Sequence, residues 1–292
     1  WINASDLYVG YRDSYSSSAT LTIEQGALVS NVTGYIGGWG GTDESVLVTG
    51  AGSRWINSGN LYIGEEDFAT LTIQDGALVS NQVGYIGSYQ GGAVSVVGTG
   101  SKWINSGSLY VGYDDYGTLT IENGAQVENT YGYIADAGYY YGVKGSVTVR
   151  GSGSKWTNTN ALYVGLYEKG ALTVEQGGQV VSASGTLGYY SGSTGTVTVK
   201  DANSIWTTGE LSIGGYGTGT LTIQQGGQVA SSSGILGQFS SGSKGTVTVT
   251  GTGAKWTNSG DIYVGRVGTG TLKIEQGGQV SNSAAYLGYT SG

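Results

Sequence analysis

Residues 209–258 read GELSIGGYGTGTLTIQQGGQVASSSGILGQFSSGSKGTVTVTGTGAKWTN, and this stretch contains one pattern twice. The segment Thr220–Ile223 (TLTI) returns as Thr246–Val249 (TVTV). Each copy follows a glycine-rich turn and a short apolar segment, and each precedes a third segment that contains Val229 or Trp256. The unit of roughly 50 residues therefore holds two coils of roughly 25 residues, each with three short strands. Self-similarity at this period is typical of solenoid proteins.

The middle segment of the coil recurs eleven times along the chain, mostly at intervals of 25 residues. Apolar and polar residues alternate within it, so that Leu21 and Ile23 share one face of a strand and Thr20 and Thr22 share the other. The apolar face is expected to point inward in every copy. The copies begin at Thr20, Ser45, Thr70, Ala93, Thr118, Ser146, Ala171, Thr196, Thr220, Thr246 and Thr271.

The first segment of each coil alternates in the same way and predicts an outward column of tyrosines. This column contains Tyr8, Tyr35, Tyr62, Tyr85, Tyr110, Tyr133 and Tyr163, lapses at Thr186, Ser212 and Ile235, and resumes at Tyr263 and Tyr286. Stacking along a sheet and recognition of sugar rings are both open interpretations of such a column.

The third segment alternates valine and tryptophan at one inward position, which lets large and small side chains interdigitate in successive layers. An asparagine follows two residues later in most coils. A buried amide must form hydrogen bonds, so each asparagine is expected to bond the next one along the axis. The residues predicted for this core are Trp55, Trp103, Trp156, Trp206, Trp256, Asn57, Asn81, Asn105, Asn129 and Asn158.

These patterns predict an all-β protein: a right-handed parallel β-helix of about twelve coils, with a double-coil repeat of about 50 residues. No composition break is visible, so residues 1–292 are interpreted as one solenoid domain of about six repeats, truncated at both ends. Solenoids need terminal caps, and neither end resembles one. We therefore expect further repeats of the same chain or self-association end to end.

The composition excludes several classes of protein. Glycine contributes 57 of 292 residues, and proline, cysteine, methionine and histidine are absent. The net charge of −8 argues against nucleic-acid binding, which needs basic surfaces. No apolar stretch is long enough to span a membrane. Without histidine and cysteine, the common nucleophile–base pairs and histidine-ligated metal sites are impossible.

Several motifs resemble a repeat found in autotransporter passenger domains and in secreted bacterial proteins with PEP-CTERM sorting signals. The resemblance rests on residues 219–223 (GTLTI), 226–229 (GGQV), 245–249 (GTVTV) and 256–260 (WTNSG), and it extends over the whole chain in about six copies. It implies a bacterial, secreted or cell-surface β-helix that is often adhesive. The expected location is therefore extracellular or at the bacterial cell surface.

Acidic residues gather in the loops that follow the first segment of alternate coils. Glu65, Glu66, Asp67, Asp114 and Asp115 are candidates for weak calcium binding, because hard cations prefer clustered oxygen ligands. No dedicated calcium-loop motif is present, and no other cofactor is expected. The same carboxylates leave open a third and least favoured class, a polysaccharide-degrading enzyme.

The favoured interpretation is a non-enzymatic extracellular structural protein that acts as an adhesin stalk, a spacer or a subunit of a matrix filament. The alternative is a binding module for a surface glycan or a host receptor. It would use the tyrosine column or the loop at residues 136–142, which contains Tyr139, Tyr140 and Tyr141.

Overall fold

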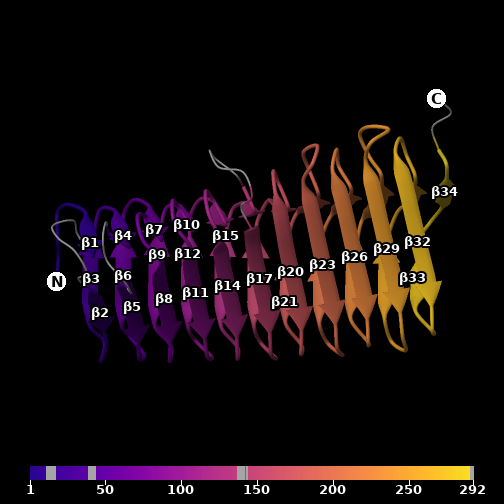
Figure 1. The fold of residues 1–292 in the computed structure, drawn as a ribbon. Coiled ribbons are helices and arrows are strands. Elements are labelled where there is room, and N and C mark those ends of the chain that lie inside the picture. Colours follow the sequence, from indigo (N-terminus) through magenta and orange to yellow (C-terminus); the bar gives the residue numbers. More distant parts are fainter. Residues whose placement is uncertain (11–17, 39–43, 137–141, 143, 290–292) are drawn as a thin grey trace.

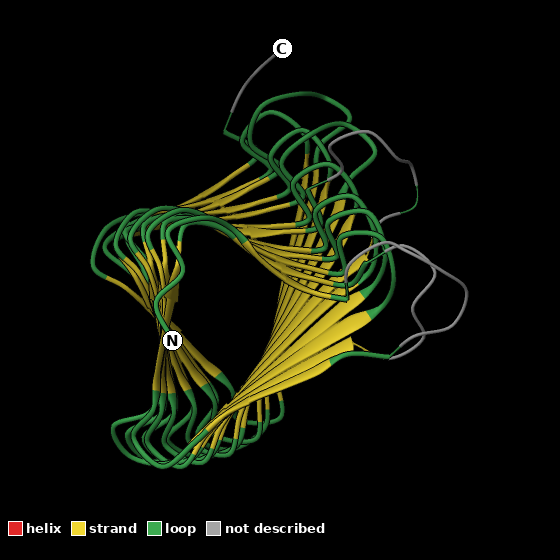
Figure 2. Ribbon diagram, turned by 90° about the vertical axis from the view of Figure 1, so that its left-hand side faces the viewer, coloured by secondary structure: helices red, strands yellow, loops and turns green. Residues whose placement is uncertain are grey.

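The computed structural model describes residues 1–10, 18–38, 44–136, 142 and 144–289. Within these ranges every regular element is a β-strand, and the strands form three parallel sheets that run the length of a rod (Figure 1). The chain visits the sheets in turn, so that about eleven turns are stacked side by side. Viewed toward the end that carries the N-terminus, the sheets form three walls joined by loops (Figure 2). The all-β solenoid predicted from the repeat is confirmed, whereas its right-handed sense remains a prediction.

The three sheets are named here by their content: the tyrosine sheet, the long sheet and the tryptophan sheet. The tyrosine sheet has twelve described strands: β1 (Leu7–Val9), β4 (Gly34–Ile36), β7 (Leu61–Ile63), β10 (Gly84–Ile86), β13 (Leu109–Val111), β16 (Gly132–Ile134), β19 (Ala161–Val164), β22 (Ser184–Leu187), β25 (Glu210–Ile213), β28 (Ser233–Leu236), β31 (Ile262–Val264) and β34 (Ala285–Leu287). The long sheet has eleven: β2 (Thr20–Ile23), β5 (Glu44–Thr49), β8 (Ala69–Gln74), β11 (Gly92–Val97), β14 (Gly117–Glu122), β17 (Lys144–Arg150), β20 (Lys169–Glu175), β23 (Thr194–Lys200), β26 (Thr218–Gln224), β29 (Lys244–Thr250) and β32 (Thr269–Glu275). The tryptophan sheet also has eleven: β3 (Leu28–Asn31), β6 (Arg54–Asn57), β9 (Leu78–Asn81), β12 (Lys102–Asn105), β15 (Gln126–Asn129), β18 (Lys155–Asn158), β21 (Gln179–Val181), β24 (Ile205–Thr207), β27 (Gln228–Ser231), β30 (Lys255–Asn258) and β33 (Gln279–Ser281).

The register of the long sheet matches the repeat read from the sequence. Thr20 pairs with Ser45, which pairs with Thr70, and the corresponding residues pair up to Thr246 and Thr271. This register stacks apolar positions on apolar positions at every step, because a shift by one residue would turn the whole apolar set toward water. The apolar faces of all three sheets consequently meet inside the rod.

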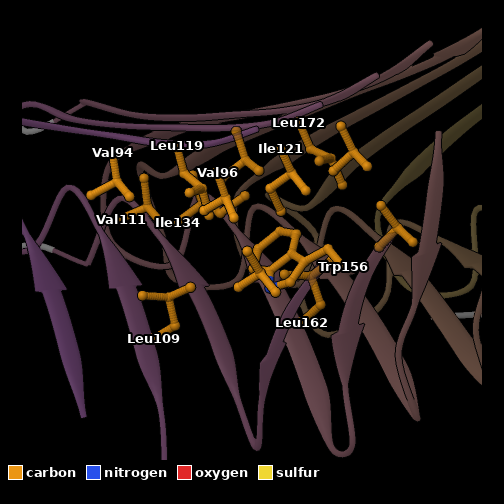
Figure 3. Close-up of a cluster of buried hydrophobic side chains, with 14 of the residues drawn as sticks. Val94, Val96, Leu109, Val111, Leu119, Ile121, Ile134, Trp156, Leu162 and Leu172 are labelled. Carbon is orange, nitrogen blue, oxygen red and sulfur yellow. The ribbon is translucent and has the colours of Figure 1, made fainter. Parts of the chain in front are cut away.

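The interior is a continuous apolar core, part of which is shown in Figure 3. Leu109, Val111 and Ile134 of the tyrosine sheet, Leu119 of the long sheet and Trp156 of the tryptophan sheet all belong to it and are at most 1% exposed. All five predicted core tryptophans have no exposed surface, and the five predicted asparagines are at most 4% exposed. Burial of one tryptophan in every second coil gives this narrow rod most of the aromatic volume in its core.

Each buried tryptophan lies against the glycine in the tyrosine-sheet strand of its own coil. A Cβ atom added to Gly185 would lie 2.6 Å from Cζ2 of Trp206, and one added to Gly234 would lie 2.5 Å from Cζ2 of Trp256. The same arrangement recurs at Gly34, Gly84 and Gly132, where the distances are 2.8, 2.8 and 2.9 Å. A coil that contains glycine and tryptophan therefore alternates with a coil that contains leucine or isoleucine and valine, and this alternation is the structural basis of the two-coil repeat.

The indole N–H groups show why the polar residues are buried beside the tryptophans. Nε1 of Trp156 donates to Oδ1 of Asn129 at 2.7 Å, and the Nδ2 of Asn129 donates to Oδ1 of Asn158 at 2.6 Å. The same three-residue unit occurs at Trp55 and Trp103, with each bond at 2.7 Å. At Trp206 and Trp256, serine hydroxyls replace the first amide, and Thr208 or Asn258 takes the second position.

The prediction of a continuous asparagine ladder is wrong. Nδ2 of Asn158 points to the main-chain oxygen of Val181 at 3.5 Å, and Nδ2 of Asn57 points to that of Ser80, also at 3.5 Å. The column is therefore divided into separate tryptophan–polar–polar units, one per two coils. The physical reason is that an indole donor enters only at every second coil and pairs with the asparagine of the coil before it.

Glycine permits the sharp corners between the tyrosine sheet and the long sheet. At the corner that follows β13, Gly112 has φ of +74°, and a Cβ there would lie 2.7 Å from the main-chain oxygen of Lys144.

The described residues contain no helix of the length and hydrophobicity that a membrane span requires.

Candidate functional site

The first seven tyrosines of the predicted column form an uninterrupted stack along the outer face of the tyrosine sheet, and Tyr263 and Tyr286 form a separate stacked pair beyond the gap. Seven rings from successive coils lie nearly parallel, with neighbouring centroids 4.7–5.4 Å apart and interplanar angles of 2–12°. The parallel register causes this stack, since it places each tyrosine directly beside the next one at the spacing of paired strands. The rings are those of Tyr8, Tyr35, Tyr62, Tyr85, Tyr110, Tyr133 and Tyr163.

Most rings of the stack are partly buried, and this raises their pKa values. Burial, together with the neighbouring phenols, raises the pKa of Tyr35 and of Tyr133 to about 12. Burial likewise raises the pKa of Tyr85 and of Tyr110. These four phenols are therefore uncharged at neutral pH.

Stacking determines what the column is able to bind. Each internal ring is covered on both faces by its neighbours, and Tyr113 adds edge contacts to Tyr85 and Tyr110 at centroid distances of 4.9 and 5.3 Å. A sugar ring that packs on an aromatic residue uses the flat face of that residue. Only ring edges and hydroxyl groups remain for a ligand here, which favours the stacking interpretation of the column.

The column lapses where the sequence predicts it, but two of the replacement residues are more buried than an outward position suggests. Ser212 and Ile235 are each 3% exposed. Tyr189 belongs to the loop after β22 and contacts the edge of Tyr163, with centroids 5.3 Å apart, and it also lies 6.4 Å from the ring of Phe239. Loop aromatics thus surround the region in which the column lacks a tyrosine of its own.

The calcium candidates lie in the loops after β7 and β13. Asp114 is 4% exposed, Glu66 is exposed, and Glu65, Asp67 and Asp115 are partly buried. Oδ1 of Asp115 accepts a hydrogen bond from the main-chain nitrogen of Tyr116 at 2.6 Å. Across the described ranges no three acidic side chains come close enough together to hold a metal ion. Calcium binding stays a hypothesis that depends on these five carboxylates.

Two acidic side chains beside these loops have raised pKa values. Burial, followed by the nearby carboxyl of Asp114, raises the pKa of Asp136 to about 6. Burial also raises the pKa of Glu65, with Glu66 and Asp114 adding to the effect and a hydrogen bond from Ser88 opposing it. The charge of Asp136 therefore changes at mildly acidic pH. Tyr139, Tyr140 and Tyr141 of the predicted binding loop lie outside the described residues.

The sequence interpretation missed a second row of aromatic side chains, on the loops between the tyrosine sheet and the long sheet. These side chains are 39–50% exposed and occur once per coil in much of the rod: Phe68, Tyr89, Tyr116, Tyr167, Tyr190, Tyr216 and Phe239. A signal for them exists in the sequence. Each follows, by two or four residues, the glycine that ends a segment of the tyrosine sheet.

Comparisons with known proteins add little. The chain matches no model of a protein family, and a search of curated proteins finds no match. Among solved structures, the chain is similar to the crystal structure of a hyper-glycosylated fragment of TibA, residues 55–350, modified by TibC. The match covers 95% of this chain and 99% of that one, with 18% identity and a TM-score of 0.28. At that TM-score the similarity carries no argument about this chain, so the resemblance to autotransporter passengers stays a prediction.

Proposed function

We propose that the chain is a non-enzymatic structural rod of an extracellular bacterial surface, serving as a stalk, a spacer or a filament subunit. The observation that carries the proposal is the uninterrupted ladder of three parallel sheets from β1 to β34. Each coil is hydrogen-bonded to the coil before it and the coil after it, and bending the rod would break main-chain bonds on the stretched side. Such an object holds two points apart at a set distance.

The interior supports the same proposal. In every second coil a fully buried indole fits against a glycine and donates to a buried polar side chain, as at Trp156, Gly132 and Asn129. Packing of this kind resists local deformation, because each indole can neither move outward nor lose its hydrogen bond without a cost. Stiffness is the property that a stalk or a spacer requires.

The two ends of the rod support end-to-end association. Ile274 is 52% exposed and Leu287 is 78% exposed, although they continue inward columns that contain Val249 and Leu236, both of which have no exposed surface. At the opposite end Ile2 is 80% exposed. Apolar side chains in such positions are stabilised when another coil covers them. We propose that a further coil or a second copy of the chain supplies this cover.

Imaging of the native assembly tests the proposed function. Negative-stain electron microscopy of material taken from its source should show straight rods or filaments whose width equals that of one solenoid. A concentration series in sedimentation velocity tests the ends. The wild-type chain should form larger species as its concentration rises, and Ile274→Lys should reduce them because it introduces a charge into the end face. Flexible strings of beads in the images would contradict the rod, and compact particles would do so too.

A further inference from the structure

The aromatic side chains on the loop edge from Tyr116 onward, all but Tyr116 itself in the C-terminal half, form a surface that the fold does not need. This surface, called the aromatic ridge here, consists of Tyr116, Tyr167, Tyr190, Tyr216 and Phe239, and each side chain is 39–46% exposed. The residues belong to loops between the tyrosine sheet and the long sheet, which Figure 2 shows gathered at one corner of the rod. Small polar residues would serve such turns equally well. A series of exposed rings along one corner therefore indicates an interaction surface.

The ridge differs from the tyrosine column in the access that it gives to its rings. Tyr167 and Tyr190 stack as a pair with centroids 4.1 Å apart, and Tyr216 and Phe239 form a second pair at 4.9 Å. Pairing covers one face of each ring, whereas the column covers both faces of its internal rings. Together with their exposure, this leaves ring surface available to a ligand.

A hollow lies beside the ridge, at the edge where the strands of the long sheet begin. Its volume is about 310 Å³, and Tyr116, Lys144 and Lys169 are among its lining residues. Gly145 and Gly170 also line it, and both are buried. The hollow also has hydroxyl groups, which come from Ser146, Thr194 and Thr196.

The positions of Lys144 and Lys169 bring two positive charges close together, which does not stabilise the fold. Lys144 and Lys169 are exposed and are register partners on adjacent strands, an arrangement in which like charges repel. On the same sheet, Lys200 forms an ion pair with Glu175, its Nζ lying 2.8 Å from the carboxylate. In the described part of the chain neither Lys144 nor Lys169 takes part in an ion pair. An anionic ligand in the hollow would relieve the repulsion between them.

The distribution of charge along the chain favours an anionic partner for this half in particular. Residues 1–141 contain 14 acidic and 3 basic residues, whereas residues 142–292 contain 6 acidic and 9 basic residues. The C-terminal half is therefore positive within a protein whose net charge is −8. A negatively charged polymer would be attracted to this half and repelled by the other.

We propose that the aromatic ridge and the adjoining hollow bind an acidic polysaccharide that lies along the rod. The anionic groups of the polymer would pair with Lys144 and Lys169, its sugar rings would pack on the exposed aromatic faces, and its hydroxyl groups would bond the serine and threonine side chains of the hollow. A linear polymer fits a surface that repeats at each coil. This binding activity is separate from the structural role, so its absence would leave the rod function intact.

Binding of defined polymers tests this proposal. Affinity electrophoresis or biolayer interferometry with polygalacturonate, chondroitin sulfate and neutral dextran separates carboxylate, sulfate and uncharged ligands. The wild-type chain should bind at least one of the two acidic polymers, more weakly as salt concentration rises, and should not bind dextran. Lys144→Ala combined with Lys169→Ala should weaken binding by about tenfold. Tyr167→Ser combined with Tyr190→Ser should weaken it to a similar extent.

Matched variants separate a local site from general attraction to positive charge. Lys155→Ala combined with Lys255→Ala removes two lysines from the tryptophan sheet and should change binding less than about twofold. Circular dichroism of each variant shows whether the fold persists. The proposal is overturned if neither acidic polymer binds, or if both lysine pairs have equal effects. It is also overturned if the ridge variants change sedimentation of the protein and leave polymer binding unchanged, because a second copy would then be the partner.

Discussion

Substitution of Gly185 by alanine tests the packing between tryptophan and glycine most directly. A Cβ at this position would lie 2.6 Å from Cζ2 and 2.9 Å from Cη2 of Trp206, and 3.0 Å from Cδ1 of Leu211. Carbon atoms in contact normally lie about 3.5–4.0 Å apart, so the indole or the strand must move by roughly 1 Å. The indole has no exposed surface into which it can move. Overpacking of this kind costs about 1–3 kcal/mol, and we expect Gly185→Ala to destabilise the chain by this amount.

Urea denaturation followed by circular dichroism and tryptophan fluorescence measures the effect. Gly242→Ala is the matched control, because its new Cβ would meet nothing nearer than Oγ of Ser240 at 3.8 Å, and we expect a change within about 0.5 kcal/mol. In a Trp206→Phe background the outer indole atoms are absent, so the cost of Gly185→Ala should shrink. Equal stability of Gly185→Ala and Gly242→Ala would refute the packing argument. An unchanged cost in the Trp206→Phe background would also refute it.

Three further predictions concern buried polar and titratable groups. Asn129→Ala leaves the buried indole N–H of Trp156 without its acceptor and should cost about 1–3 kcal/mol in urea denaturation. Asp136 has a pKa raised to about 6, so the folded state favours the neutral carboxyl. The stability of the folded state should therefore fall as pH rises from about 4 through 6. Asp136→Asn should flatten this part of the plot of melting temperature against pH. The pKa values of Tyr35 and Tyr133 are likewise raised in the folded state, so stability should fall again as pH rises from about 10 to 12. In the folded protein, the phenolate absorbance of these two residues should appear at a higher pH than that of an ordinary tyrosine. Retention of full stability by Asn129→Ala, an Asp136→Asn profile that matches wild type, or tyrosine titration at the ordinary pKa would each contradict its prediction.

The sequence alone determined the coil, its three strands and their register. Period-2 alternation within residues such as Thr220–Ile223 sets which side chains face inward, and recurrence at about 25 residues sets which strands become neighbours. Both properties are local or strictly periodic, so they are readable without knowledge of the tertiary structure. Alternation of valine and tryptophan likewise indicated a two-coil unit. The tyrosine column was predictable for the same reason.

The tertiary structure alone decided which side-chain atoms meet within and between coils. It showed that the glycines of the tyrosine sheet, such as Gly185, make room for the indole of the same coil. It replaced an expected continuous asparagine ladder with separate units such as Trp156–Asn129–Asn158, and it gathered exposed loop aromatics into a ridge. Sequence periodicity specifies the direction in which a side chain points, whereas its depth, its rotamer and the atom that it reaches depend on two walls of the solenoid facing each other across the core.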